Sequence, residues 1–201
     1  MKNGNYVDQE IIYLRGYYQE KMRSFDLLTD SVSVCGRNIR FAPYVLFDGN
    51  VCVWIPEDFI VMPEKVAKVR YITEYRPSVI LTNEQYDENF CFHLLKEEEI
   101  QKPIVLDLLI QQMQNTILLH ASETVIYEQG NILADKIDGK WFEYKGFTLD
   151  EETYNLYFLI YSVPYLLIGA FNCRMKFYDE WRNIVLNLIK YIEIRKQEDK
   201  E

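Results

Sequence analysis

Two apolar strands joined by an irregular crossing, within residues 51–83, constrain the fold of this chain more than any other feature. Residues 51–55 read Val-Cys-Val-Trp-Ile, so both faces of this segment are apolar. A strand that is apolar on both faces lies inside a sheet that is covered above and below. Pro56 ends this strand, because proline supplies no N–H to the ladder, and Pro77 opens a second strand at residues 78–82. We expect one sheet that begins with these two strands and continues after them.

Two β-hairpins are predicted within residues 31–55, where short apolar runs flank glycine-containing turns. The first turn is placed at Gly36-Arg37 and the second at Asp48-Gly49. Asp-Gly between apolar runs is the strongest short hairpin signal, because a type I′ turn requires positive φ angles.

A run of further strands with short connections follows. The strands are expected at residues 89–95, 123–129, 132–137, 140–148, 153–163 and 166–173, with turns at Gln129-Gly130-Asn131 and Asp138-Gly139. Short connections favour antiparallel neighbours, because a parallel pair needs a crossover of a dozen or more residues. The sequence therefore predicts an α+β protein with a mainly antiparallel, twisted sheet.

Three helices are predicted from apolar residues that recur three and four positions apart, at residues 8–28, 103–119 and 179–196. The inward face of the second helix is predicted to hold Val105, Leu108, Leu109, Gln112, Met113, Thr116 and Ile117. The last helix is predicted to bury Trp181, Ile184, Val185, Leu188 and Ile192. We expect helices on both faces of the sheet, and the first helix to be an addition that packs on its own domain or on another chain.

Several short motifs support this architecture. They are Ile55-Pro56-Glu57-Asp58-Phe59 with Met62, Arg76-Pro77-Ser78-Val79-Ile80 with Asn83, Tyr154–Phe158, Gly169-Ala170-Phe171-Asn172-Cys173 and Trp181. Together they span most of residues 31–195 and resemble the Mog1/PsbP-like α/β/α sandwich, especially its bacterial branches of unknown function. The resemblance implies the fold alone, because that fold carries unrelated roles, a small-GTPase-binding protein and an extrinsic photosystem subunit among them.

Length and composition favour one globular domain. A chain of 201 residues with 49% hydrophobic and 26% charged residues is long enough for a substantial core and has ordinary globular composition. We expect an N-terminal helical extension at residues 1–30, a single domain at residues 31–196 and a solvated tail at residues 197–201.

The charge balance argues against nucleic acid as a partner, since 22 basic residues face 31 acidic ones and phosphate binding needs clustered lysine and arginine. No apolar run approaches the roughly 20 residues that span a bilayer, and the first ten residues lack the apolar core of a signal peptide. The cysteines at positions 35, 52, 91 and 173 stand singly in apolar stretches, which is typical of free thiols in a reducing compartment. A cytoplasmic protein without a membrane partner is the expectation.

Neither histidine stands in a pattern typical of catalysis. His93 alternates with Cys91 on a predicted strand, but residues two apart on one face lie about 6 to 7 Å apart, beyond hydrogen-bonding reach. His120 ends a predicted helix, where a cation complements the partial charge of the helix terminus. The sequence contains no Cys-x-x-Cys, HExxH, Walker A, GxGxxG or GxSxG motif, so we expect no catalytic residues, no cofactor and no metal site.

Tyrosine is the compositional oddity, with 16 copies in the chain. Tyrosine combines apolar area with a polar tip and is enriched at protein interfaces. Tyr13 and Tyr17 lie one turn apart, away from the main apolar face of the first predicted helix, and are the candidate partner-binding residues.

The leading hypothesis is a non-enzymatic cytoplasmic accessory or adaptor protein that acts through protein-protein binding. The alternative is a small-molecule or peptide-binding module with an aromatic-lined pocket between sheet and helix. A third reading, a hydrolase-like enzyme, requires His93 or His120 beside a cysteine, aspartate or glutamate in a cleft.

Overall fold

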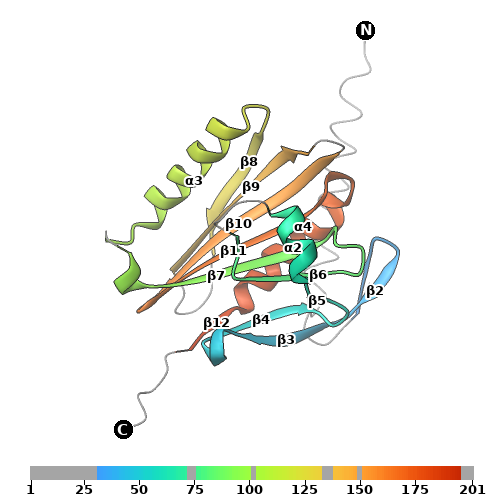
Figure 1. The fold of residues 1–201 in the computed structure, drawn as a ribbon, viewed down its shortest axis with the longest axis horizontal. Helices are drawn as coiled ribbons and strands as arrows, with labels where there is room; N and C mark the ends of the chain where they lie inside the picture. The colour runs from blue at the N-terminus through green and yellow to red at the C-terminus, as the bar shows by residue number, and fades with distance from the viewer. Residues whose placement is uncertain (1–30, 72–75, 101–102, 133–137, 149–150, 196–201) are drawn as a thin grey trace.

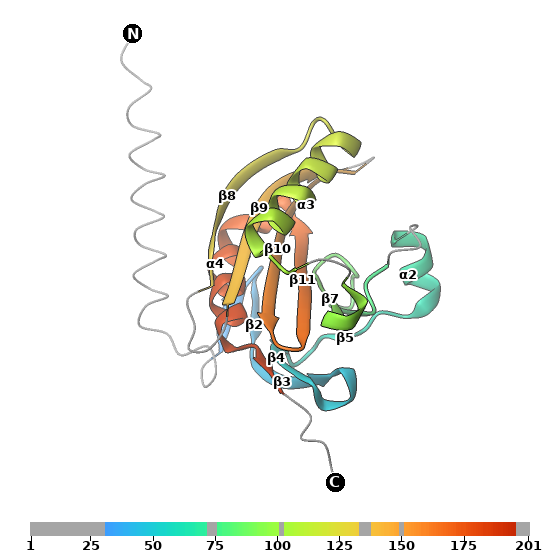
Figure 2. The ribbon, with the colours of Figure 1, turned by 90° about the vertical axis from the view of Figure 1, so that its left-hand side faces the viewer.

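The computed structural model describes residues 31–71, 76–100, 103–132, 138–148 and 151–195. The helix expected at residues 8–28, with Tyr13 and Tyr17, lies outside the described residues, as does most of the strand expected at residues 132–137. The described part is an α+β structure in which helices cover both faces of a large antiparallel sheet, and a small sheet packs on one of those faces (Figures 1 and 2). The predicted fold class is confirmed.

The larger sheet has seven strands in the spatial order β5-β6-β7-β11-β10-β9-β8. In chain order they are β5 (Ile60–Val61), β6 (Val79–Thr82), β7 (Asn89–Lys96), β8 (Val125–Asn131), β9 (Asp138–Phe147), β10 (Glu152–Ser162) and β11 (Tyr165–Arg174). Each neighbouring pair is antiparallel, as the short connections predict. β8 forms one edge of this sheet.

The smaller sheet has three strands in the order β12-β4-β3. They are β3 (Phe41–Leu46), β4 (Val51–Pro56) and β12 (Glu193–Ile194), and a separate hairpin, β1 (Val32–Val34) and β2 (Arg37–Ile39), precedes them. The central position of β4 explains why it is apolar on both faces. The expectation that the strands at residues 51–55 and 78–82 begin one sheet is wrong, because β4 and β6 belong to different sheets that share one apolar core.

Both hairpins predicted within residues 31–55 form, with turns that differ in detail. The first turn is Cys35-Gly36 rather than Gly36-Arg37, and both of its residues have positive φ, 51° and 74°. The second turn spans residues 47–50, because Leu46 pairs with Val51 across it. Its Asp-Gly pair has the positive φ values that the hairpin signal requires, 54° and 95°.

Two glycines that suggested turns lie inside strands instead. Gly130 is in β8, where a Cβ would lie 3.0 Å from the indole nitrogen of Trp141. Gly139 is in β9, where a Cβ would lie 2.8 Å from Cδ1 of Ile132. The predicted turns at residues 129–131 and 138–139 are therefore wrong, because these glycines admit large neighbouring side chains rather than reversing the chain.

The helices are α2 (Glu64–Arg70), α3 (Leu106–His120) and α4 (Tyr178–Leu188), with single 3-10 turns η1 (Phe47–Gly49), η2 (Glu97–Glu99), η3 (Met175–Phe177) and η4 (Ile189–Tyr191). Sequence patterning did not predict α2. The packed residues of α3 are Leu106, Leu109, Ile110, Met113 and Ile117, so its inward face is rotated from the predicted one and Leu108 is exposed.

The last predicted helix ends earlier than residue 196. α4 stops at Leu188, and the chain then enters η4 and β12, whose Ile194 pairs with Val51 of the small sheet. The predicted inward residues are nonetheless buried, and Trp181 is 0% exposed. This face of α4 packs into the core between the two sheets, while α2 and α3 cover the opposite face of the large sheet (Figure 2). No helix of the described part is both long and apolar enough to cross a membrane.

Candidate functional site

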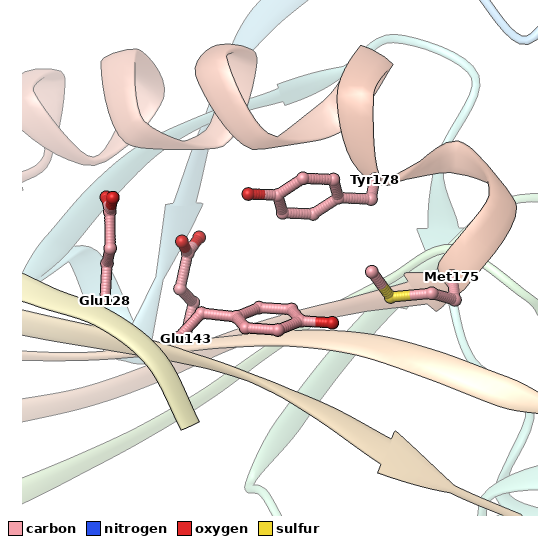
Figure 3. Close-up of a pocket in the computed structure, with 5 residues that line it drawn as sticks. Glu128, Glu143, Met175 and Tyr178 are labelled. Atoms are coloured by element: carbon pink, nitrogen blue, oxygen red, sulfur yellow. The ribbon is translucent and has the colours of Figure 1, made fainter. Parts of the chain in front are cut away.

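A pocket of about 390 Å³ opens between the β8 edge of the large sheet and the start of α4. Its lining residues are Tyr127, Glu128, Glu143, Met175 and Tyr178. Figure 3 shows the carboxylates of Glu128 and Glu143 pointing from the sheet toward α4, while Tyr178 extends from the start of that helix. The pocket therefore has one wall from each of two layers of the fold.

A β-bulge supplies the sheet side of the pocket. The register between β8 and β9 shifts between Ile126 and Gln129, so Tyr127 and Glu128 together stand opposite Glu143. Successive residues of a regular strand point to opposite faces, and a bulge changes the direction of the side chains at the extra residue. The bulge explains how two consecutive residues of β8 line one pocket.

The helix side is set by the direct passage from β11 into α4. Met175 lies in the intervening turn η3, and Tyr178 is the first residue of α4. The Tyr178 ring meets the ring of Tyr154 edge-on, with centroids 4.9 Å apart, and the ring of Tyr127 at 6.0 Å. These contacts are in the range of favourable aromatic pairs, so Tyr127 and Tyr178 form the aromatic wall of the pocket and the buried Tyr154 packs against Tyr178.

Glu143 forms the inner end of the pocket and is 0% exposed. The Nε of Arg182 donates to both of its carboxylate oxygens, at 2.9 and 3.0 Å, and the Tyr154 hydroxyl donates to Oε2 at 2.8 Å. Burial raises the pKa of Glu143, and the guanidinium and the phenol oppose that rise without cancelling it. Arg182 is itself held against the ring of Trp141, with its Cζ 5.8 Å from the centroid.

Glu128 is the outer carboxylate of the pocket, and its side chain is 65% exposed. It accepts a hydrogen bond from a terminal nitrogen of Arg182, the same guanidinium that binds Glu143. One cation is therefore shared between two carboxylates, one fixed inside the protein and one facing solvent.

The two histidines lie away from this pocket. Nδ1 of His93 is 2.5 Å from the hydroxyl oxygen of Ser78, and Cys91 lies instead 3.3 Å from the Tyr71 hydroxyl. His120 is the exposed last residue of α3. Over the described ranges, no hydrogen bond joins either histidine to a cysteine, aspartate or glutamate, and no three histidine, cysteine, aspartate or glutamate side chains are grouped as metal ligands.

Sequence reasoning did not identify any of the pocket residues. The predicted partner-binding residues, Tyr13 and Tyr17, lie outside the described part of the chain. One signal was present in the sequence. Trp141 and Glu143 share a face of β9, and a lone carboxylate on a face that packs against a core requires a partner. The position of that partner, Arg182, follows only from the packing of α4 on the sheet.

The fold is that of the Mog1/PsbP-like α/β/α sandwich, as the sequence motifs imply. One similar solved structure is cyanobacterial PsbP (CyanoP) from Synechocystis sp. PCC 6803, with 11% identity and a TM-score of 0.56 over 77% of this chain and 92% of that one. Another is LpqN of Mycobacterium tuberculosis, described as involved in cell envelope biogenesis, with 10% identity and a TM-score of 0.51 over 79% of this chain and 92% of that one. No protein-family model and no curated protein matches the sequence. At such identities the likeness establishes the fold alone.

Proposed function

We propose that this protein is a non-enzymatic, cytoplasmic accessory protein that binds a protein partner, and that the pocket between β8, β9 and α4 receives a side chain of that partner. The observation that carries this proposal is the pocket itself, which combines a buried charged end with an exposed aromatic and acidic rim. Well-formed pockets with aromatic walls and a few converging polar groups are the usual form of binding sites.

The bonding of Glu143 supports binding rather than catalysis. Both of its oxygens accept hydrogen bonds from Arg182, and one also accepts from Tyr154. A general base must reach the proton that it removes, and this carboxylate is fully enclosed by its own partners. The groups in the pocket are thus arranged to hold a charge in place.

The position of the pocket favours a macromolecular ligand. Tyr127 is 40% exposed on the edge strand β8, and Val125 of the same strand is 47% exposed. Exposed aromatic and aliphatic side chains beside a pocket are suited to contact a partner surface. Tyr13 and Tyr17 remain a second proposed contact. The test compares the affinity of the double variant Tyr13→Ala/Tyr17→Ala for a partner with the affinity of the unaltered chain.

A small molecule is the second candidate ligand. The pocket volume of about 390 Å³ lies within the range of small-molecule sites, roughly 300–1,000 Å³. A ligand that fills the pocket would raise the melting temperature of the protein, because it binds the folded state alone.

Photo-crosslinking tests the proposed function. A photoreactive p-benzoylphenylalanine replaces Tyr127, and in the control it replaces Tyr191, which is 41% exposed and lies in η4. We expect a partner that crosslinks from position 127 and not from position 191, and whose purified form loses at least about tenfold in affinity when Tyr178 is changed to Ala. Equal crosslinking from both positions, or an affinity unaffected by the Tyr178→Ala change, would overturn the proposal.

A further inference from the structure

We propose that the pocket selects a positively charged group, an ammonium or guanidinium carried on an apolar stem. This inference rests on the proposed function and names the chemical class of the group that is bound. It follows from three properties of the pocket: its net charge, its aromatic wall and its apolar side.

The charge of the pocket is the first property. Glu128 and Glu143 share the single guanidinium of Arg182, so two negative charges face one positive charge. Arg182 binds Glu143 through Nε at 2.9 Å and is fixed in that place, whereas Glu128 is the solvent-exposed partner. An entering cation therefore meets an excess negative charge at the rim, and an entering carboxylate or phosphate meets repulsion.

The neighbouring charges do not reverse this balance. Lys145 of β9 pairs with Glu152, with its Nζ 2.6 Å from the carboxylate. Lys176 of η3 places its Nζ over the ring of Phe177, 4.7 Å from the centroid. In the first turn of α4, the carboxylate of Glu180 is directed to the first hairpin, where it accepts a hydrogen bond from the backbone N–H of Cys35. The ion pairs of the described residues join neither lysine to Glu128 or Glu143, so the two pocket carboxylates keep their excess of negative charge over Arg182.

The aromatic wall is the second property. The rings of Tyr127 and Tyr178 line the pocket with centroids 6.0 Å apart and planes inclined at 56°. The faces of aromatic rings attract ammonium and guanidinium groups, and the attraction grows where water is excluded. Carboxylates next to aromatic rings form a chemical environment that suits an organic cation better than a neutral apolar group.

The apolar side is the third property. Met175 lines the pocket beside Tyr178, and its thioether is flexible and polarizable. Lysine and arginine bury their methylene stems on apolar surface and keep the charged end near polar groups. The pocket offers both surfaces at once, since Met175 and the tyrosine rings would contact the stem while Glu128 would receive the charge.

Titration by NMR with matched probes tests the inference. The probes are Nα-acetyl-lysine N-methylamide, its arginine analogue, the neutral norleucine analogue and the acidic glutamate analogue, each followed by the backbone amide signals of Tyr127, Glu143 and Tyr178. We expect saturable shifts from the two cationic probes, with affinity at least about fivefold above that of the norleucine analogue and decreasing with added salt. n-Butylammonium and a lysine-containing heptapeptide distinguish the two sources of the charge, a free amine and a peptide side chain.

Two conservative variants locate the interaction. Glu128→Gln keeps the shape of the rim and is expected to lower the affinity for the lysine probe by about threefold to tenfold. The control is Glu98→Gln, at an exposed glutamate of η2, which is expected to leave that affinity unchanged. Tyr127→Leu removes a ring and keeps apolar area, and Tyr191→Leu is its matched control. Equal effects of a variant and its control overturn the inference.

The outcomes also separate this inference from the proposed function. Binding of the norleucine or glutamate analogue as tightly as the lysine analogue, with shifts at the pocket, refutes the preference for cations and leaves the binding site in place. Absence of pocket shifts from all probes, together with a partner that crosslinks from position 127, also refutes the preference for cations and leaves the proposed binding of a protein partner in place. Absence of both the shifts and the crosslink refutes the site.

Discussion

Glu143 is the residue on which the local structure of the pocket depends. A buried carboxylate is strongly unfavourable unless hydrogen bonds and an opposite charge compensate for the lost hydration. Arg182 provides the charge and Tyr154 provides one further hydrogen bond. The same guanidinium fixes Glu128 at the rim, so one contact between α4 and the sheet sets both the stability and the shape of the site.

Removing the charge of Arg182 is predicted to destabilise the protein in a pH-dependent way. Arg182→Met leaves Glu143 buried without a counterion, which costs roughly 3–5 kcal/mol at neutral pH. The pKa of Glu143 is already raised in the folded protein above its ordinary value of 4.5, and the variant raises it further. Between the pKa of Glu143 in the unfolded chain and its raised pKa in the folded protein, the folded state holds more protons than the unfolded state. The free energy of unfolding therefore falls as the pH rises through this range.

Denaturant unfolding of the two proteins at pH 4 and pH 7 measures this effect. The deficit of Arg182→Met is expected to be large at pH 7 and to shrink by more than half at pH 4, where the carboxyl of Glu143 is protonated in the variant. Arg195→Met is the control, because Arg195 and Glu193 form an exposed pair that contributes about 0–1 kcal/mol. A deficit that is the same at both pH values would show that Arg182 acts by packing alone.

At the scale of elements, the pairing of β10 with β11 depends on one glycine, which leaves space for an aromatic ring of the neighbouring strand. Gly169 of β11 pairs with Phe158 of β10, and a Cβ at Gly169 would lie 2.0 Å from the Phe158 ring. Gly169→Ala is therefore predicted to destabilise the protein by about 1–3 kcal/mol, because the ring is 1% exposed and cannot move into solvent.

A double-mutant cycle with Phe158→Leu tests this contact. Leucine lacks the ring atoms that the new methyl group meets, so the double variant should be more stable than the sum of the two single changes predicts, by at least about 1 kcal/mol. Chemical denaturation of the four proteins gives the coupling. Additive losses would mean that the added methyl group clashes with the backbone or with other side chains.

Local chemistry made some elements predictable from the sequence. Asp48-Gly49 marks a chain reversal because its φ angles must be positive, and the apolar run at residues 51–55 marks a covered strand. Long-range contacts decided the others. α4 ends at Leu188 because the following residues pair with β4, a contact that no local pattern of residues 179–196 contains.

The candidate site was less predictable than the fold, for a physical reason. Its sheet side depends on the register between β8 and β9, where a bulge brings Tyr127 and Glu128 to one side. A shift of one residue in register reverses the direction of every following side chain, and periodicity does not specify where such a shift occurs. Its helix side depends on Arg182, 39 positions from Glu143.

At the scale of the whole molecule, the free cysteines report on how tightly the two sheets and their helices enclose the core. The thiolate is the reactive form of cysteine, and a thiol with a raised pKa reacts slowly at ordinary pH. Burial raises the pKa of Cys35 and of Cys91 to about 12 and also raises those of Cys52 and Cys173. In the described residues all four are free thiols, and they occur in both sheets and in the first hairpin.

The native protein is therefore predicted to protect all four thiols from a disulfide reagent such as DTNB at pH 8. At that pH only roughly one thiol in ten thousand is ionised at Cys35 and Cys91, whose pKa is about 12. Cys52 and Cys173 are buried as well, so labelling requires opening of the fold. We expect rapid reaction of four thiols in guanidinium chloride, slow reaction in buffer, and faster reaction in buffer for Arg182→Met, because the open form is more populated. Lys65→Cys, on the exposed face of α2, provides a thiol that should react at once in the native state. Reaction of Cys35 at the rate of that surface thiol would mean that the first hairpin does not enclose it and that its environment is more open than its contacts with Glu88 and Glu180 indicate.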